Sequence, residues 1–329
     1  MPKKLQLKMG NIVIGEADLD GACLILAEEY QKEDNLKELN IKVAEESKIH
    51  PCMSYTTDFD TLKLIFQHMT FRSSSLSNAN LNDPVEKERV GISEFAKGRF
   101  ITCFCHEDHE CIPFWMYYGK HIRKNKILLQ FQNFASKFEE CIHTDYALVA
   151  ENKKCLFNTS DYGKIVNSQY LPGFESEEYD LRGCIDAILM FDVEYVPITS
   201  EIFSEDNSGK TNVSFGESSV EGNSVMMRSY DPRSLGKQKS DPWEYEKETR
   251  VMSVLSGMQF PDWNYIDLRL KPEIFRNLKI VLSPWDEDEL RPLVEEVISN
   301  CSLPQDIKDS IQILDSGLKG KLNFPENEQ

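Results

Sequence analysis

Three carboxylates and one guanidinium lie close together in residues 243–250, which read Trp-Glu-Tyr-Glu-Lys-Glu-Thr-Arg. The apolar run 251–255 that follows has the β-branched and large side chains of a buried strand. If 243–250 is the leading half of that strand, its period of two places Glu244, Glu246, Glu248 and Arg250 on one face. Carboxylates that share a face raise one another's pKa or pair with the arginine. Such a group suits a site for cationic or sugar-like ligands.

Two structural interpretations compete with a site at 243–250. The segment is also compatible with a solvated strand edge, because runs of charge usually form solvated faces. A helix is the other interpretation, since Glu246 and Arg250 are four residues apart and would pair on its surface. Spacing alone leaves these alternatives open, so a functional site at 243–250 needs support from other segments of the chain.

Residues 103–111 contain three cysteines and two histidines. Zinc usually takes four such ligands from two places in a fold, in tetrahedral geometry. The one-residue spacing of Cys103 and Cys105 makes closure by a single loop awkward. We therefore expect no metal site here, and a buried Cys103 followed by a polar loop up to Cys111.

The densest basic cluster is formed by Lys120, His121, Arg123, Lys124 and Lys126. A solvated turn accounts for it, but so does an anion or phosphate contact beside the aromatic rings of Trp115, Tyr117 and Tyr118. The chain has no Gly-x-Ser-x-Gly, His-Glu-x-x-His or P-loop motif. Serine-hydrolase, zinc-protease and P-loop ATPase chemistry of those types are therefore excluded.

Apolar spacing predicts an α+β fold with a mixed sheet. Leu36, Leu39 and Val43 form a helical stripe within a predicted helical segment at 17–48, and Asp58 is a candidate cap for a helix carrying Leu62 and Phe66. Predicted strands cover 69–71, 100–104, 126–131, 188–196 and 278–283, and a helix is expected over 286–299. Residues 200–238 read as a long polar insertion. No regular βαβ units or glycine-rich phosphate loop appear, which disfavours a Rossmann-type fold.

The composition limits location and partners. Among the 329 residues, 40% are hydrophobic and the net charge is −18. A sizeable core is expected, and general affinity for nucleic acid or anionic membranes is disfavoured. No apolar run approaches the roughly 20 residues that span a bilayer. Nine irregularly spaced cysteines and a polar amino-terminal segment predict a cytoplasmic protein.

Several short motifs occur in a definite order. They are Leu81-Asn82-Asp83-Pro84 with Glu86, Ile101–Phe104, Phe114–Tyr118, Lys126–Phe131, Lys239 with 243–250, and Ile280–Ser283. This order resembles the uncharacterised prokaryotic family called domain of unknown function 2971, over about residues 50–318. The chain departs from that family in an amino-terminal extension, in the insertion near 200–238 and in Gly119-Lys120-His121.

The resemblance implies a core domain at 50–318, a helical extension at 1–49 and a tail at 319–329. It implies a ligand cleft formed by the motif residues, namely Asn82, Asp83, Trp115, Tyr118, Lys239, Trp243 and Arg250. Family members are free-standing bacterial proteins, some of them encoded among phage-defence or mobile genes. A protein or nucleotide ligand is the corresponding expectation.

Three functions stay open. In a binding or accessory protein, Asn82 and Asp83 satisfy loop amides, Glu246 and Arg250 form a buried ion pair, and the acidic surface recognises a basic partner. In an ADP-ribosyltransferase-like enzyme that uses NAD, Tyr55 or His50 contacts the cofactor, Glu248 stabilises the oxocarbenium-like charge, Glu246 positions the acceptor and Arg72 or Arg250 meets a phosphate. In a nuclease, Asp83, Glu246 and Glu248 hold Mg²⁺.

Overall fold

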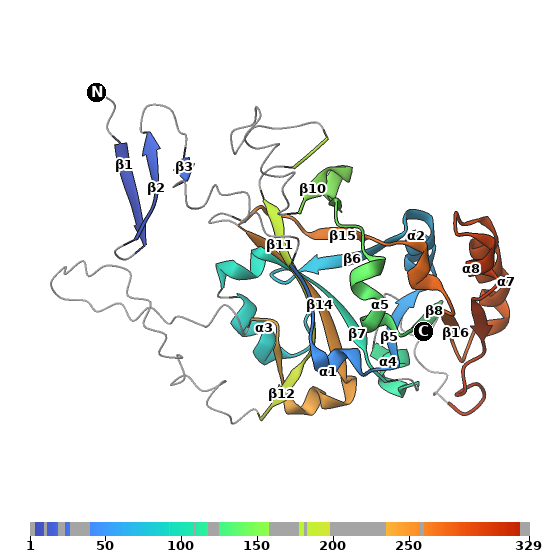
Figure 1. The fold of residues 1–329 in the computed structure, drawn as a ribbon. Helices are drawn as coiled ribbons and strands as arrows, with labels where there is room; N and C mark the ends of the chain where they lie inside the picture. Colours follow the sequence, from blue (N-terminus) through green and yellow to red (C-terminus); the bar gives the residue numbers. More distant parts are fainter. Residues whose placement is uncertain are drawn as a thin grey trace.

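Twelve strands join into one mixed sheet in the computed structural model of the protein, and helices flank the sheet, so the fold is α+β (Figure 1). The structure describes residues 4–9, 12–18, 24–26, 40–91, 93–107, 110–117, 125–157, 178–180, 183–197, 235–256 and 260–322. None of the helices in these ranges is long and apolar enough to cross a membrane.

The strands of the main sheet vary from three to nine residues. They are β4 (Asn40–Val43), β5 (Cys52–Asp58), β6 (Thr70–Ser75), β7 (Arg99–Cys105), β8 (Lys126–Gln132), β9 (Tyr146–Val149), β10 (Lys154–Leu156), β11 (Cys184–Asp192), β14 (Glu248–Ser256), β15 (Tyr265–Arg269), β16 (Lys279–Leu282) and β17 (Gln312–Leu314). A parallel pair, β12 (Glu194–Val196) and β13 (Gln238–Ser240), lies beside it. A separate antiparallel sheet contains β1 (Lys4–Met9), β2 (Ile12–Asp18) and β3 (Leu24–Leu26).

Strand β7 is the branch point of the main sheet. One edge of β7 pairs along its whole length with β14, from Arg99 opposite Val254 to Cys105 opposite Glu248. Its other edge pairs with β6 near the amino end and with β5 only at Cys105. Strands β5 and β6 therefore diverge beside the middle of β7, and the sheet opens at that point.

The helices and short 3-10 turns cover the sheet. They are α1 (Glu45–Lys48), α2 (Phe59–His68), α3 (Pro84–Gly91), α4 (Ile112–Tyr117), α5 (Phe134–Cys141), α7 (Glu287–Asn300) and α8 (Gln305–Lys308), with η3 (Glu94–Gly98), η4 (Ala150–Asn152), η5 (Asp241–Glu246) and η6 (Pro272–Phe275). The predicted cap is confirmed, because the Asp58 carboxylate accepts the Thr61 amide at 2.8 Å. Helices α7 and α8 lie at the β16 end of the sheet (Figure 1).

The two faces of the β7–β14 pair have different contents. Residues of one face, including Phe104 and Val251, join the large core with Phe131 and the α5 residue Phe134. The rings of Phe104 and Phe134 lie 4.7 Å apart, a distance typical of packed aromatic pairs. Residues of the other face alternate with them, as the period of a strand requires. This second face holds a smaller apolar cluster around Ile101 and Met252.

The expected helix at 17–48 is wrong in the described residues. Strands β3 and β4 lie within this segment, and α1 is its one described helix. Val43 belongs to β4, where it is buried and pairs with Met190 in a parallel register. Exposed Lys42 and buried Val43 alternate as neighbouring residues of a strand do. Val43 therefore fits a strand, although its spacing from Leu36 and Leu39 also fits a helix. Leu36 and Leu39, and most of the polar insertion, lie outside the described residues.

Candidate functional site

A cavity of about 970 Å³ opens where β5 and β6 diverge from β7. The strands contribute residues 54–58, Arg72 and Ser74, and residues 101–105 to its walls. Thr61, the loop at 79–82, Phe114 and six residues of the 239–250 region complete the lining, and these six are Lys239, Trp243, Tyr245, Glu246, Glu248 and Arg250. The octapeptide is thus one wall of a cavity.

Arg250 is the centre of a buried charge network behind this wall. Its side chain is 1% exposed, and its Nε donates to Glu248 Oε1 at 2.7 Å. Its Nη2 donates to Glu86 Oε2 at 3.0 Å and its Nη1 to the Gly236 carbonyl at 2.7 Å. Because these bonds satisfy the buried guanidinium on several sides, the ion pairs can persist away from water. The expected pair of Glu246 with Arg250 is replaced by Glu248 and Glu86.

Lys239 links the two glutamates of the octapeptide. Its ammonium pairs with Glu246 and lies 2.8 Å from Glu248 Oε2. Asn82 donates to the second oxygen of Glu246 at 2.5 Å. Burial opposes the charge on Glu248, but Arg250 and Lys239 outweigh it and lower its pKa to about 2. Burial likewise opposes the charge on Lys239, and Glu248 and Glu246 raise its pKa nonetheless.

The octapeptide is only partly strand. Residues 243–246 belong to η5, Lys247 has a left-handed backbone with φ of 43°, and β14 begins at Glu248. Glu244 is exposed and pairs with Lys247 at 3.1 Å, so it does not share a strand face with Glu248. Glu246 nonetheless pairs with Lys239 and lines the cavity together with Trp243 and Tyr245 of η5. The expected single face of four charged residues is wrong.

Asp83 supports the cavity wall from behind. It is 0% exposed, and its Oδ1 accepts the Val85 amide at 2.9 Å. Its Oδ2 accepts the amide and the hydroxyl of Ser240, at 2.7 and 2.9 Å. Asp83 therefore ties the Asn-Asp-Pro loop to β13, which holds Asn82 and Lys239 in place. The expectation that Asp83 itself lines a ligand cleft is not met.

Cys103 and Tyr55 present protonated groups to the cavity. We expected Cys103 to be buried, but it is exposed to this space, and it pairs with Arg250 in the strand register. Withdrawal from bulk water and the nearby Glu248 raise the pKa of its thiol. Withdrawal from water also raises the pKa of Tyr55 to about 12. Both side chains are hydrogen-bond donors at neutral pH.

Aromatic rings and one arginine line the outer part of the cavity. Trp243 and Tyr245 lie in η5 with their ring centroids 6.0 Å apart. Arg72 donates from Nε and Nη2 to the two oxygens of Asp267, each at 2.9 Å, and its guanidinium lies 3.6 Å from the Tyr265 ring centroid. These contacts fix the Arg72 guanidinium in one orientation.

Trp115 does not belong to this site. It is 1% exposed, packs with Leu128 and Val281, and donates from Nε1 to Glu110 Oε2 at 3.0 Å. Its neighbour Phe114 lines the cavity instead. Tyr118, like residues 119–124 of the basic cluster, lies outside the described residues. Lys126 is buried and donates to the Trp115 carbonyl at 2.5 Å, and burial lowers its pKa to about 8.

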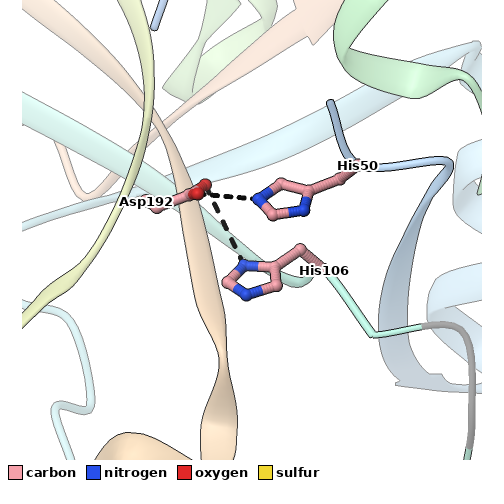
Figure 2. A group of neighbouring side chains, drawn as sticks. All are labelled: His50, His106 and Asp192. Carbon is pink, nitrogen blue, oxygen red and sulfur yellow. Dashed lines mark hydrogen bonds and ion pairs between the residues drawn. The ribbon is translucent and has the colours of Figure 1, made fainter. Parts of the chain in front are cut away.

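A second polar cluster contains His50, His106 and Asp192. Figure 2 shows both imidazoles turned toward the carboxylate of Asp192. His50 Nε2 lies 2.7 Å from Asp192 Oδ2, and His106 Nδ1 lies 3.9 Å from Asp192 Oδ1. The two rings are stacked, with centroids 4.0 Å apart. Within the described part of the chain, these three residues are the one group of metal-ligand type whose ligand atoms lie within 4.8 Å of one another.

Sequence reasoning named His50 only as an alternative cofactor contact and missed His106 and Asp192 as partners. Two of the three residues lie at strand ends: Asp192 is the last residue of β11 and His106 follows β7. Strand β14 pairs with β11 on one edge and with β7 on the other, which brings these ends together. A polar titratable residue at the end of an apolar strand was the available signal. By contrast, Asp83, Glu246 and Glu248 form no metal-type group in the described residues.

Comparison of the chain with protein-family models, curated proteins and solved structures yields no match. The resemblance to domain of unknown function 2971 therefore stays a prediction.

Proposed function

We propose that the protein binds a nucleotide-type ligand in the cavity between β5, β6 and β7. The observation that carries this proposal is the convergence of aromatic, cationic and carboxylate side chains on one space. Its volume of about 970 Å³ lies at the upper end of the range of roughly 300–1,000 Å³ for small-molecule sites. The buried pairs of Arg250 and Lys239 hold the wall rigid, which lowers the ordering cost of binding.

In the proposed complex each part of the ligand meets a suitable group. The base stacks on Trp243 or Tyr245, since aromatic faces accept any base. The ribose hydroxyls meet Asn82 and the thiol of Cys103, and the phosphates meet Arg72. The residues that line the cavity include three cations and three carboxylates, the capping Asp58 among them, so the local charge does not repel an anion as the whole chain does.

Calorimetric titration with ATP, GTP, ADP-ribose and NAD tests this proposal. We expect Trp243→Ala to weaken binding by a factor of about 5–150, the equivalent of roughly 1–3 kcal/mol of stacking. Arg72→Ala is expected to weaken it by a similar factor. Arg269→Ala is the matched control, because Arg269 also pairs with an aspartate, Asp145, and lies over a tyrosine ring outside the cavity. Equal losses in the two arginine variants, or no binding at millimolar ligand, would overturn the proposal.

ADP-ribosyl transfer from NAD is the second candidate. Its specific support is that Tyr55 and Glu248 line the same cavity and that Glu248 stays ionised. In this reaction the bond between ribose C1′ and the nicotinamide nitrogen breaks, and its electron pair leaves with neutral nicotinamide. Glu248 would stabilise the positive charge at C1′, and an acceptor would add there and lose its proton near Glu246.

Release of nicotinamide from NAD tests the second candidate. Glu248→Gln is expected to abolish release, and Tyr55→Phe to raise KM for NAD. Glu244→Gln is the control, because Glu244 is an exposed glutamate of the same segment. Circular dichroism of each variant separates loss of chemistry from loss of fold. NAD binding without release would leave the binding function and remove this candidate. A basic protein partner, expected from the net charge of −18, is the alternative if no nucleotide binds.

A further inference from the structure

We propose that His50, His106 and Asp192 form a binding site for one divalent transition metal ion of the zinc class. This site is separate from the cavity and does not depend on the proposed nucleotide ligand. Strand β14 contributes residues to both sites. Thr249 contacts the histidine cluster, whereas Glu248 and Arg250 on the opposite face of the strand line the cavity.

The geometry brings three ligand atoms close to the separation that a metal requires. In tetrahedral zinc sites, bonds of about 2.0–2.2 Å place neighbouring ligand atoms roughly 3.3 Å apart. Here one imidazole nitrogen is already 2.7 Å from the carboxylate, and the second is at 3.9 Å. The two rings are parallel to within 3°, and an imidazole lone pair lies in its ring plane. One ring must therefore tilt when an ion binds, which is a side-chain rotation.

The ligand types and the exposure of the cluster suit metal binding. Imidazole nitrogens and a carboxylate oxygen are ordinary zinc ligands. The cluster is partly open to solvent, with exposures of 17–19% for the three side chains. Water can therefore complete the coordination of an ion held by three protein ligands.

Outer hydroxyl groups orient the carboxylate. Ser47 Oγ donates to Asp192 Oδ1 at 2.8 Å, and Thr249 Oγ1 donates to the same oxygen at 2.7 Å. Thr249 Oγ1 also lies 3.1 Å from His106 Nδ1. Such outer contacts fix ligand orientation in metal sites. Two imidazoles with one carboxylate favour zinc, cobalt or iron over magnesium and calcium, which prefer oxygen ligands.

Metal titration of the chelator-treated full-length protein tests the site. Zn²⁺ is expected to bind in calorimetry with one equivalent, and Co²⁺ is expected to give visible d–d absorption without thiolate charge-transfer bands. Mg²⁺ and Ca²⁺ are expected not to compete at equal concentration. His106→Ala and Asp192→Asn should abolish this binding, and Thr249→Val should weaken it by about 10–100-fold. His68→Ala is the matched control, since His68 is an exposed imidazole on α2.

Several outcomes would overturn the proposal. The proposal is wrong if the unmodified protein does not bind Zn²⁺ stoichiometrically, or if the Co²⁺ spectrum is dominated by thiolate bands. It is also wrong if folded Asp192→Asn, which preserves the size of the side chain, still binds Zn²⁺. In those cases the three residues serve as a hydrogen-bonded tie between β11, β14 and the segment before β5.

Discussion

Arg250 shows how one buried residue defines the cavity wall. It contacts Glu86 from α3, Glu248 from β14 and the backbone of Gly236 before β13, so three segments meet at one guanidinium. Taking each ion out of water costs several kcal/mol, and only the paired geometry offsets this cost. The planar fork of arginine gives two parallel hydrogen bonds to each of the two carboxylates, a geometry that a lysine ammonium cannot provide. Arg250 is therefore a positioning residue of the site.

Arg250→Met is expected to lower the free energy of unfolding by about 3–5 kcal/mol, because it leaves Glu86 and Glu248 buried without their partner. Arg269→Met removes a surface pair with Asp145 and should cost about 0–1 kcal/mol. Urea unfolding of both variants measures the difference. A loss of the same size in both variants would contradict a buried network that depends on Arg250.

The elements differ in how far the sequence predicts them. Strand β8 is predicted correctly because four of the five residues from Ile127 to Phe131 are apolar, and all five are buried. The start of β14 is not, because the left-handed turn at Lys247 has no glycine to indicate it. Asn82, Lys239, Trp243 and Glu248, which the motif order grouped, line one cavity in the structure. The strand-end signal marks His106 and Asp192 only singly. Their meeting depends on β14 lying between β7 and β11, and strand order is not encoded in local spacing.

The turn before β13 gives a prediction at the scale of one element. Gly236 has φ of +79°, and a Cβ there would lie 2.8 Å from Met252 Cε and 3.1 Å from Leu76 Cδ2. Gly320 has a similar φ of +67° with open space around it. Both Gly→Ala changes carry the strain of a left-handed backbone, about 1–2 kcal/mol. Gly236→Ala adds crowding in a packed cluster, so we expect it to cost about 1 kcal/mol more than Gly320→Ala in urea unfolding. Equal costs of the two changes would contradict this prediction, because they would show that Met252 and Leu76 move aside without loss of stability.

The whole molecule combines an acidic surface with ionised groups buried in its interior. The net charge of −18 at pH 7 approaches zero near the isoelectric point of about 4.9, so self-repulsion decreases as the pH falls over this interval. The buried network responds in the opposite sense, and at lower pH. Its carboxylates must stay ionised to neutralise Arg250 and Lys239, and protonation of Glu248 would leave part of that positive charge uncompensated.

The stability of the protein should therefore hold or rise from pH 7 to about 5 and then fall steeply. The pKa of Glu248 is about 2 in the folded protein, against an ordinary value of 4.5. A depressed pKa contributes stability that is fully present above 4.5 and is lost as the pH falls toward 2. The contribution is on the order of 3 kcal/mol, at 1.36 kcal/mol for each pKa unit.

Urea unfolding at pH 7, 5, 4 and 3 measures this dependence of stability on pH. Glu248→Gln should lose less unfolding free energy than the wild type between pH 5 and 3, whereas the exposed control Glu244→Gln should lose as much as the wild type. If Glu248→Gln loses as much stability at low pH as the wild type does, the acid sensitivity belongs to other carboxylates.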